Sequence, residues 1–436
     1  MRQEREAAMA IELEEAVNII RVSMSSSCSL CKEEGFEENR MRLPLKAARG
    51  YILAEDILAP FSQPPFRRSA MDGYAMRYSE LDAESIPVEN TICAGCTDIP
   101  VLKPGTAVRI MTGGALPAGA EVVVRQEDVE VISDTVTPAE ASYRENSHKE
   151  PGIIAQAEEA LCRIDDIPKV RIKILHRPSR SNISEIGEDF VEGTIIAERG
   201  WRLSAGAIGC LAAAGIEEVS VYKKMRVALV ATGDELVPCG YPLQIGQIYD
   251  SSERYISSRL EELGCSLETI IHVQDDKEKI ADAILTALKK ADFLITTGGV
   301  SVGIGDLLEA VVRSLGGKVL FHGIRIKPGM PTMFSLIDGI PVLSLSGNPF
   351  SAWAMFEVLF PGRDKIYTTA KLGTSCICKR PSPKIVRGSW NGAQAVFEPK
   401  QKNGTTFEMS RSNCLIFLPE GEDKLTEGTD VKILLL

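Results

Sequence analysis

From residue 225 onward, short apolar runs alternate with segments whose apolar side chains recur at helical spacing. In the clearest helical segment, which begins near Asp275 and Asp276 and runs through Leu288, apolar positions follow the pattern of a helix with one buried face. This alternation predicts a doubly wound, mainly parallel α/β sheet with helices on both faces. Further strands are predicted at 226–231, 267–273, 293–296 and 341–345, further helices at 251–264, about 306–314 and about 350–360, and an extended stretch at 319–336.

The chain is patterned differently on either side of this α/β segment. Residues 9–22 have apolar side chains at near-helical spacing and predict one amphipathic helix. Residues 50–142 contain short β-branched runs between Pro and Gly turns, which predicts a small β-rich domain. Residues 138–182 are polar and are interpreted as connecting structure with an irregular insertion. The tail from about residue 370 has extended runs between Gly and Asn turns, which predicts a terminal β domain.

Charge and hydropathy restrict the partners. Lys and Arg number 49 against 60 Asp and Glu, which gives a formal net charge of −11. Nucleic acid is not expected as a partner, because binding its backbone requires clustered cations. No apolar stretch reaches the roughly 18 residues of a membrane span, and the charged start does not fit a signal peptide. We therefore expect a cytoplasmic protein that binds small ligands and no membrane.

The chain has 11 cysteines, and an odd count in an acidic, non-secreted chain indicates free thiols. Two CxxC pairs, Cys28/Cys31 and Cys93/Cys96, could supply four thiolates to zinc. The pairs lie far apart in the sequence and no histidine is near either, so free cysteine is the favoured interpretation. The sequence does not assign the pairs a role.

Glycine and polar residues follow the predicted parallel strands at their carboxyl ends, which meet at one edge of such a sheet and there bind ligands. Glycine-rich backbone beside carboxylates suits a phosphate or other oxyanion bridged by a hard cation such as Mg²⁺. Each motif alone is more often a turn or a helix cap, but four together favour a ligand site. The motifs are Thr232-Gly233-Asp234-Glu235, Asp275-Asp276, the glycine-rich stretch from Thr297 to Asp306, and the stretch from Ser346 to Ser351. None matches a Walker loop or G-x-G-x-x-G, so another type of nucleotide-phosphate site stays open.

Eight motifs resemble, in order, the molybdopterin molybdenumtransferase family, which includes MoeA and the gephyrin E-domain. The resemblance covers roughly residues 9–436 and implies an elongated homodimer. It also implies four segments: a linking domain (1–58 and 143–222), a small β-rich domain (59–142), a molybdopterin-binding-like α/β domain (223–366) and a β-barrel-like domain (367–436). The motifs are SAMDGYA (69–75), RIMTGGALPAGAEVVV (109–124), NISEIGEDF (182–190), ALVATGDELV (228–237), GQIYDSS (246–252), TTGGVSVGIGD (296–306), IKPGMP (326–331) and SGNPFSA (346–352).

The family resemblance implies the last step of molybdenum cofactor synthesis. Molybdenum from molybdate enters adenylylated molybdopterin, and AMP is released in a Mg²⁺-dependent step. Catalytic roles are then expected for Asp72, Thr112, Glu235, Asp275 and Asp306, with Asp275 and Asp306 also holding the metal. Substrate-binding roles are expected for Asp189, Gly298, Gly299, Ser301, Lys327, Pro331, Asn348 and Ser351. The resemblance also allows the molybdopterin adenylyltransferase and molybdoenzyme chaperones as partners.

Three features depart from the family pattern. Met330 stands where the family has a second lysine, Ser346 replaces the proline of L-P-G-N-P, and the stretch 138–181 is longer than usual. Loss of a cation near a molybdate site weakens oxyanion binding. An alternative therefore stays open: a paralogue that prefers tungstate, or a non-catalytic one that acts as a cofactor-binding or scaffold protein.

Overall fold

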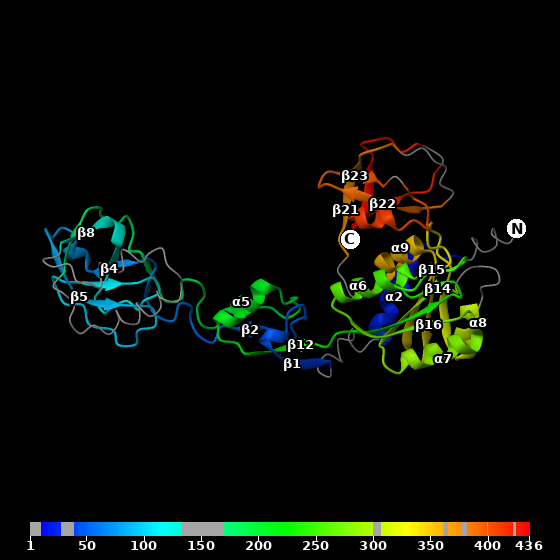
Figure 1. Ribbon diagram of the computed structural model, residues 1–436, viewed down its shortest axis with the longest axis horizontal. Coiled ribbons are helices and arrows are strands. Elements are labelled where there is room, and N and C mark those ends of the chain that lie inside the picture. Colours follow the sequence, from blue (N-terminus) through cyan, green and yellow to red (C-terminus); the bar gives the residue numbers. More distant parts are fainter. Residues whose placement is uncertain are drawn as a thin grey trace. The chain divides into compact units, whose positions relative to one another are not determined.

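The computed structural model describes residues 10–27, 39–132, 170–299, 307–361, 365–375, 382–398, 400–421 and 424–436. Contacts divide the chain into two compact units, Met1–Arg42 with Ser220–Leu436, and Leu43–Val219 (Figure 1). The chain passes from one unit to the other through β1 (Arg40–Pro44) and β12 (Glu218–Tyr222), which pair in a two-stranded sheet. The four-segment division predicted from the sequence is finer than this and stays a prediction.

The unit Leu43–Val219 contains a six-stranded sheet in the order β7-β4-β6-β5-β9-β8, which agrees with the predicted β-rich segment. Its strands bury aliphatic side chains in two clusters, around Val122 and Val124 on one side and Val108 and Val123 on the other. The strands are β4 (Gly73–Met76), β5 (Ile86–Ile92), β6 (Ala107–Ile110), β7 (Val122–Arg125), β8 (Val129–Ile132) and β9 (Arg171–Ile174).

The remaining elements of this unit are short. Two-residue strands pair as β10 with β3 and β11 with β2, and Ser204 caps the single α-helix by accepting a hydrogen bond from the Ala207 amide. They are η1 (Leu45–Ala47), β2 (Ile57–Leu58), β3 (Arg68–Ser69), η2 (Tyr78–Glu80), η3 (Gln126–Asp128), β10 (Ile183–Ser184), β11 (Ile195–Ala197) and α5 (Ala205–Ala213).

The other unit is built on a six-stranded sheet in the order β16-β13-β17-β20-β19-β18. The first four strands are parallel, as predicted, while β19 runs antiparallel to both of its neighbours. The strands are β13 (Arg226–Thr232), β16 (Ser266–Val273), β17 (Phe293–Thr297), β18 (Lys318–His322), β19 (Met333–Ile337) and β20 (Ile340–Leu345). A small parallel pair, β14 (Leu236–Val237) and β15 (Ile248–Tyr249), lies in the segment after β13.

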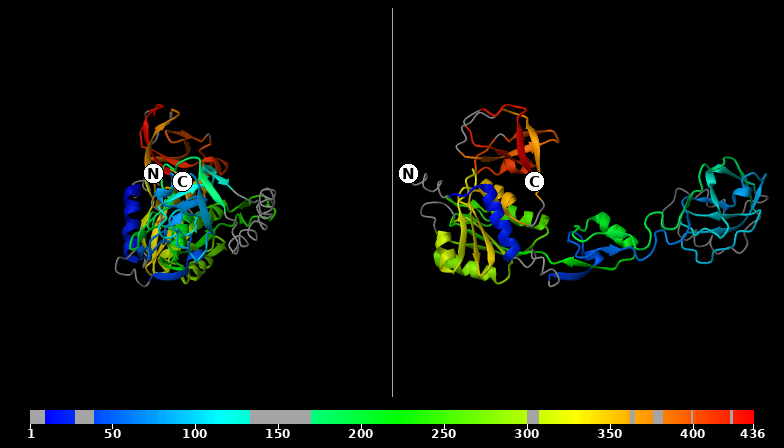
Figure 2. Two further views of the ribbon diagram at one scale, coloured as in Figure 1. Left: turned by 90° about the vertical axis from the view of Figure 1, so that its left-hand side faces the viewer. Right: turned by 180° about the vertical axis from the view of Figure 1, so that it is seen from behind.

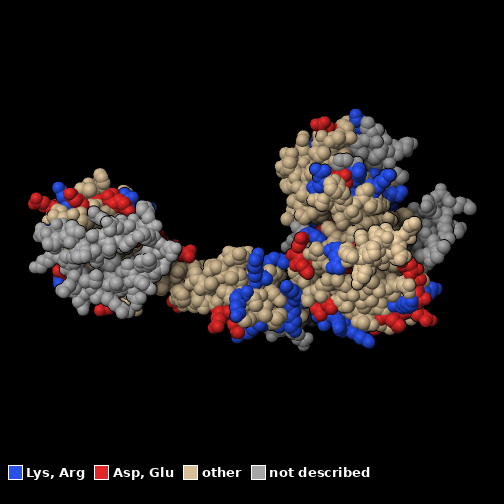
Figure 3. Space-filling view, viewed as in Figure 1, with Lys and Arg blue, Asp and Glu red and all other residues tan. Residues whose placement is uncertain are grey.

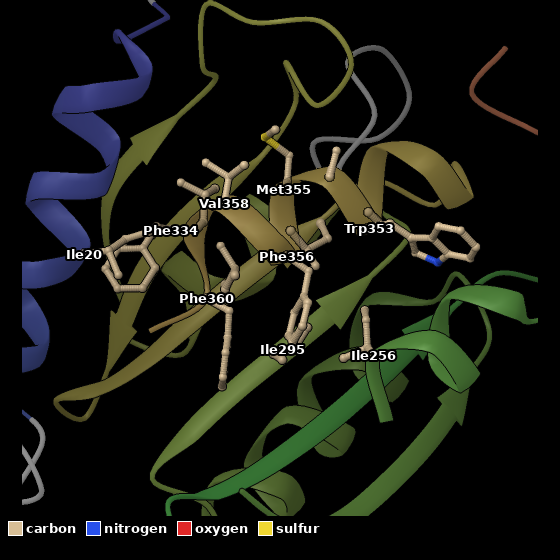
Figure 4. Packing of buried hydrophobic residues seen from close by; sticks show 14 of the residues in the cluster. Ile20, Ile256, Ile295, Phe334, Trp353, Met355, Phe356, Val358 and Phe360 are labelled. Atoms are coloured by element: carbon tan, nitrogen blue, oxygen red, sulfur yellow. The ribbon is translucent and has the colours of Figure 1, made fainter. Parts of the chain in front are cut away.

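Helices cover both faces of this sheet (Figure 2). Alternate residues of β13 face opposite ways, so Leu229 joins the core with α2, α6 and α9, whereas Val230 joins the core with α7 and α8. Figure 4 shows α9 in the first core, where Phe356 and Phe360 point from the helix toward the sheet. The helices are α2 (Leu13–Ser27), α6 (Ser251–Glu262), α7 (Lys277–Leu288), α8 (Leu307–Ser314) and α9 (Pro349–Leu359).

The first predicted helix begins later than the pattern of residues 9–22 indicates. Ile11 lies in an isolated bridge with Ile324 instead of a helix. Its amide donates to the Gly323 carbonyl at 3.2 Å, and its carbonyl accepts from the Arg325 amide at 2.8 Å. These main-chain bonds to a distant segment hold the backbone extended, so the helix starts at Leu13 and continues to Ser27.

The tail folds into a closed barrel in the order β21-β23-β22-β24-β25. Its strands are β21 (Tyr367–Leu372), β22 (Lys384–Trp390), β23 (Gln394–Phe397), β24 (Cys414–Leu418) and β25 (Asp430–Leu435), with η4 (Phe407–Arg411) before β24. Side chains such as Ile385, Leu415 and Leu434 join the core that surrounds α9, so the barrel and the α/β domain share apolar contacts. None of the helices described is long and apolar enough to cross a membrane.

A buried charged network ties α6 to α9. The Arg259 guanidinium donates to both carboxylate oxygens of Glu357, at 2.7 and 3.1 Å, and the Tyr255 hydroxyl donates to the same carboxylate at 2.6 Å. Burial works against the charged arginine, but the hydrogen bonds and charge of Glu357 raise the pKa of Arg259. Burial and the neighbouring carboxylate raise the pKa of Tyr255 well above 10.0. The network is therefore fixed as an ion pair with a neutral phenol.

Replacing Glu357 by alanine should destabilise the α/β domain, because Arg259 would keep a buried charge without its partner. We expect the free energy of unfolding to fall by about 3 kcal/mol. Glu262 also pairs with Arg259, but its side chain is 61% exposed, so Glu262→Ala should cost only about 0–1 kcal/mol. Chemical denaturation of the wild type and the two variants measures the difference. Equal losses of unfolding free energy in the two variants would contradict the stabilising role of the buried Arg259–Glu357 pair.

Candidate functional site

Four loops leave the sheet at one edge because the parallel strands end in register. Thr232, the last residue of β13, pairs with Val273, the last residue of β16. Thr297 at the end of β17 pairs with Leu345 at the end of β20, and Ala231 pairs with Thr297. The structure therefore brings the described residues of the four predicted strand-end motifs to one edge, which we call the rim.

The Gly298-Gly299 turn lies directly on the end of β13. Both glycines have positive φ, 84° and 65°. A Cβ atom on Gly298 would lie 2.2 Å from the Thr232 carbonyl oxygen, and one on Gly299 would lie 3.1 Å from the Thr232 hydroxyl. The turn therefore needs glycine at position 298 for both conformation and space. Gly298 is buried and its amide donates to the Leu345 carbonyl at 3.1 Å, while Gly299 is partly buried. The backbone at Gly299 is therefore the part of the turn that suits a phosphate.

Two adjacent aspartates at the rim have different surroundings. The Asp276 carboxylate caps α7 by accepting from the amides of Glu278 and Lys279, both at 3.0 Å. Asp275 is exposed, and its carboxylate makes no hydrogen bond or ion pair with the described residues. Glu235 is also exposed at this edge, with its carboxylate folded back toward Gly233. Only Asp276 is used by the fold, so Asp275 and Glu235 are available to a ligand.

The loop after β20 leads into α9 and contributes polar groups. Asn348 occupies the cap position of α9, but its side chain makes no capping bond, and it is exposed. The main-chain amide of Asn348 donates to the Ser346 hydroxyl at 3.3 Å. Ser351 lies in the first turn of α9 and is 3% exposed. Pro349 has no N–H and the Phe350 amide donates to the Asn403 carbonyl at 3.0 Å, so this loop offers an anion the partial positive charge at the start of α9.

The loop from β18 to β19 carries Lys327 and Pro331. Met333 pairs with His322 on one side and with Ser344 on the other, so both ends of this loop lie at the same edge as the carboxyl end of β20. Lys327 is exposed and Pro331 is partly buried. The loop is packed on α9, since a Cβ atom on Gly329 would lie 2.3 Å from Met355 Cγ.

In the unit Leu43–Val219, the structure brings together Asp72 and Thr112. The Asp72 carboxylate accepts from both the amide and the hydroxyl of Thr112, each at 2.7 Å. Gly73, next to Asp72, pairs with Ile110, which precedes Thr112 by two residues. Asp189 is exposed in a loop after β10, and its amide donates to the Gln63 carbonyl at 3.0 Å. Thr112 thus orients Asp72 through two hydrogen bonds.

Other predicted groups cannot be placed in this geometry. Ser301 and Asp306 lie outside the described residues, as do Cys28 and Cys31. Cys93 and Cys96 are not in a disulfide bond. Within the described part of the chain, no group of three or more His, Cys, Asp or Glu side chains could hold a metal ion.

The sequence analysis does not assign Thr232 a role, although it forms the base of the rim. Its side chain is 3% exposed, and its hydroxyl finds no hydrogen-bond partner among the described residues. The residue ends an apolar run, so the sequence shows only the end of a strand. The available signal is the glycine pair that begins 66 residues further along the chain. Its contact with Thr232 is visible only in the folded structure.

Family models cover nearly the whole chain. They match the MoeA N-terminal region (domain I and II) at residues 11–215, a probable molybdopterin binding domain at 228–364 and the MoeA C-terminal region (domain IV) at 369–436. The molybdopterin molybdenumtransferase of Synechococcus elongatus is 30% identical over 415 residues, which cover 90% of this chain and 93% of that protein. The chain belongs to the MoeA family of molybdopterin molybdenumtransferases.

Other relatives agree with this MoeA membership, and it places the chain in molybdenum cofactor biosynthesis. The molybdopterin molybdenumtransferase of Haemophilus influenzae is 36% identical over 319 residues, which cover 73% of this chain and 70% of that protein. The crystal structure of the molybdopterin biosynthesis MoeA protein from Pyrococcus horikosii is 26% identical and has a TM-score of 0.70, over 98% of this chain and 99% of that one. The predicted fold class is confirmed.

The Gly298-Gly299 turn gives a direct test of how the rim is built. Gly298→Ala adds a Cβ against the Thr232 carbonyl at positive φ and should cost about 2–4 kcal/mol of unfolding free energy. Gly316→Ala is the control: its φ is 76° but no atom lies within 4 Å of an added Cβ, so only the roughly 1 kcal/mol conformational cost applies. Chemical denaturation compares the two; equal costs would show that the turn does not depend on contact with β13.

Proposed function

We propose that this chain inserts molybdenum from molybdate into adenylylated molybdopterin and releases AMP in a Mg²⁺-dependent step, as a cytoplasmic homodimer. The observation that supports the proposal is the rim, where strand register gathers a glycine turn, a helix N-terminus and unpaired carboxylates at one edge. MoeA family membership supplies the reaction class. Adenylylated molybdopterin and molybdate are the proposed substrates, with the molybdopterin adenylyltransferase and molybdoenzyme chaperones as further partners.

The rim groups divide the proposed work by their chemistry. In this proposal the Gly298-Gly299 turn, through the backbone of Gly299, and the positive end of α9 face the phosphates, and their fixed dipoles stabilise the charge that develops as the phosphoanhydride bond breaks. Lys327 and Ser351 donate to oxyanion oxygens. Glu235 orients a ligand group or a water molecule. Thr112 holds Asp72, which we propose for the same reaction together with Asp189.

Asp275 fits the requirements of a Mg²⁺ ligand, and we propose that it holds this ion with Asp306. An exposed carboxylate that the fold leaves unused is a donor of the right kind. Mg²⁺ is usually held by one or two carboxylates, with substrate phosphates and water completing its shell, so a cage of three protein ligands is not required. When bound, the ion would offset the charge of the phosphates beside the rim carboxylates.

One observation favours a second candidate function. Met330 puts an uncharged thioether in the loop that carries Lys327. This loop therefore has one cation fewer than the family pattern, which can alter the preferred oxyanion or the turnover. The alternative is a paralogue that prefers tungstate or binds the cofactor without catalysis. Assays with graded molybdate and graded tungstate separate these possibilities.

The two adjacent aspartates allow a test of the proposed chemistry. Asp275→Asn should abolish AMP release at unchanged stability, because the fold does not use this carboxylate. Asp276→Asn should retain both activity and stability, since asparagine caps a helix as well as aspartate does. The measurement is release of AMP by the purified protein with adenylylated molybdopterin, Mg²⁺ and graded molybdate.

Two outcomes of this assay would count against the proposal. Full turnover by Asp275→Asn would remove this residue from the mechanism. Binding of adenylylated molybdopterin by the wild-type protein without AMP release, at any concentration of molybdate or tungstate, would contradict the enzyme and favour the scaffold.

A further inference from the structure

The Lys327 loop is joined to the barrel by an isolated parallel β-bridge between Lys327 and Lys384. The Lys327 amide donates to the Pro383 carbonyl at 3.0 Å, and the Lys327 carbonyl accepts from the Ile385 amide at 2.7 Å. Lys384 is the first residue of β22. Two lysines from distant parts of the sequence are therefore placed side by side by main-chain hydrogen bonds.

Their charges are not compensated by the described part of the protein. Residues paired in neighbouring strands lie about 4.8 Å apart and project their side chains to the same side. Lys327 is exposed and Lys384 is partly buried, and neither side chain forms an ion pair or hydrogen bond with the described residues. Two lysine side chains that start this close on the same side can both reach one anion, and an anion bound between their ammonium groups would offset the repulsion between them.

Both lysines are attached to rigid structure. Gly329 holds the Lys327 loop against Met355 of α9, and Ile385, next to Lys384, is fully buried in the core that surrounds α9. The backbone of both lysines is thus in place before any ligand binds, which lowers the entropic cost of binding. Figure 3 shows Lys and Arg atoms gathered on the part of the barrel that adjoins the α/β domain, in a chain whose net charge is −11.

We propose that Lys384 is a second cation, beside Lys327, for the tetrahedral oxyanion of the reaction, molybdate. The inference rests on the proposed function for the identity of that anion. The loop contains two cations, but Arg325 is paired with Glu12 and Glu420, and Met330 is uncharged. Lys327 is therefore the cation of the loop that has no acidic partner among the described residues. The barrel supplies the second charge through the bridge, so the oxyanion site is built from two domains of one chain.

Titration calorimetry with molybdate tests this assignment on the full-length protein. Lys384→Gln should weaken molybdate binding roughly tenfold, the effect of losing one charge-assisted contact, and added salt should reduce the difference. Lys384→Arg should retain binding. Lys318→Gln is the matched control, because Lys318 begins β18 and is an exposed lysine at the opposite edge of the sheet.

Two results would overturn the proposal: wild-type affinity in Lys384→Gln, or an equal loss in Lys318→Gln. The substitution should fold normally, since Pro383 and Ile385 make the bridge through their main chain. Protection from acetylation gives an independent reading on the wild-type protein. Molybdate should protect Lys384 and not Lys318, and equal labelling of Lys384 with and without molybdate would also overturn the proposal.

The AMP assay separates failure of this inference from failure of the proposed function. Lys384→Gln should raise the molybdate concentration for half-maximal turnover and leave kcat unchanged. If the wild-type protein turns over normally and Lys384→Gln needs no more molybdate than the wild type, the lysine pair alone is refuted. Molybdate binding that depends on Lys384 without any AMP release would refute the reaction alone.

Discussion

Register between the parallel strands β16, β13, β17 and β20 fixes where each loop of the rim begins. Hydrogen bonds pair Thr232 with Val273 and Thr297 with Leu345, so these strands end together. The antiparallel strand β19 brings the Lys327 loop to the same edge. A slip of one residue would turn every side chain of a strand to the other face and break two cores at once. The geometry of the rim is thus secured by the packing of the whole domain.

The barrel also holds parts of the candidate site in place. Arg387 on β22 is fully buried, lies 4.1 Å over the Phe350 ring and donates to the carbonyls of Lys400 and Lys402 at 2.8 and 2.9 Å. The Phe350 amide, in the first turn of α9, donates to the Asn403 carbonyl at 3.0 Å. The start of α9 and the Lys327 loop are therefore both held by the barrel. The buried charges of this unit stabilise its fold, whereas the exposed charges at the rim are left for ligands.

The sequence predicts the parts of the fold that depend on local pattern. Continuous apolar runs identify β13 and β17, which are buried on both faces, and apolar residues at helical spacing identify α7. It does not give pairing direction, so the stretch 319–336 is recognised as extended but not as the antiparallel hairpin of β18 and β19. The local pattern also extends the first helix over Ile11, because it cannot show the long-range bridge of this residue to Ile324.

The candidate site shows the same division. Glycines, carboxylates and strand ends are visible in the sequence, and so is the family. The contact between Gly298 and Thr232, the different surroundings of Asp275 and Asp276, and the pairing of Lys327 with Lys384 depend on tertiary structure. Lys384 gives no signal of its own, because it is one lysine before an apolar run and becomes notable only through its bridge partner.

The most direct test is a crystal structure of the full chain with AMP, Mg²⁺ and tungstate, whose heavy atom marks the oxyanion by anomalous scattering. The rim account predicts the phosphate at the Gly298-Gly299 turn and tungsten within reach of the ammonium groups of Lys327 and Lys384. A phosphate or tungsten position away from these groups, in a crystal where both are bound, would contradict it.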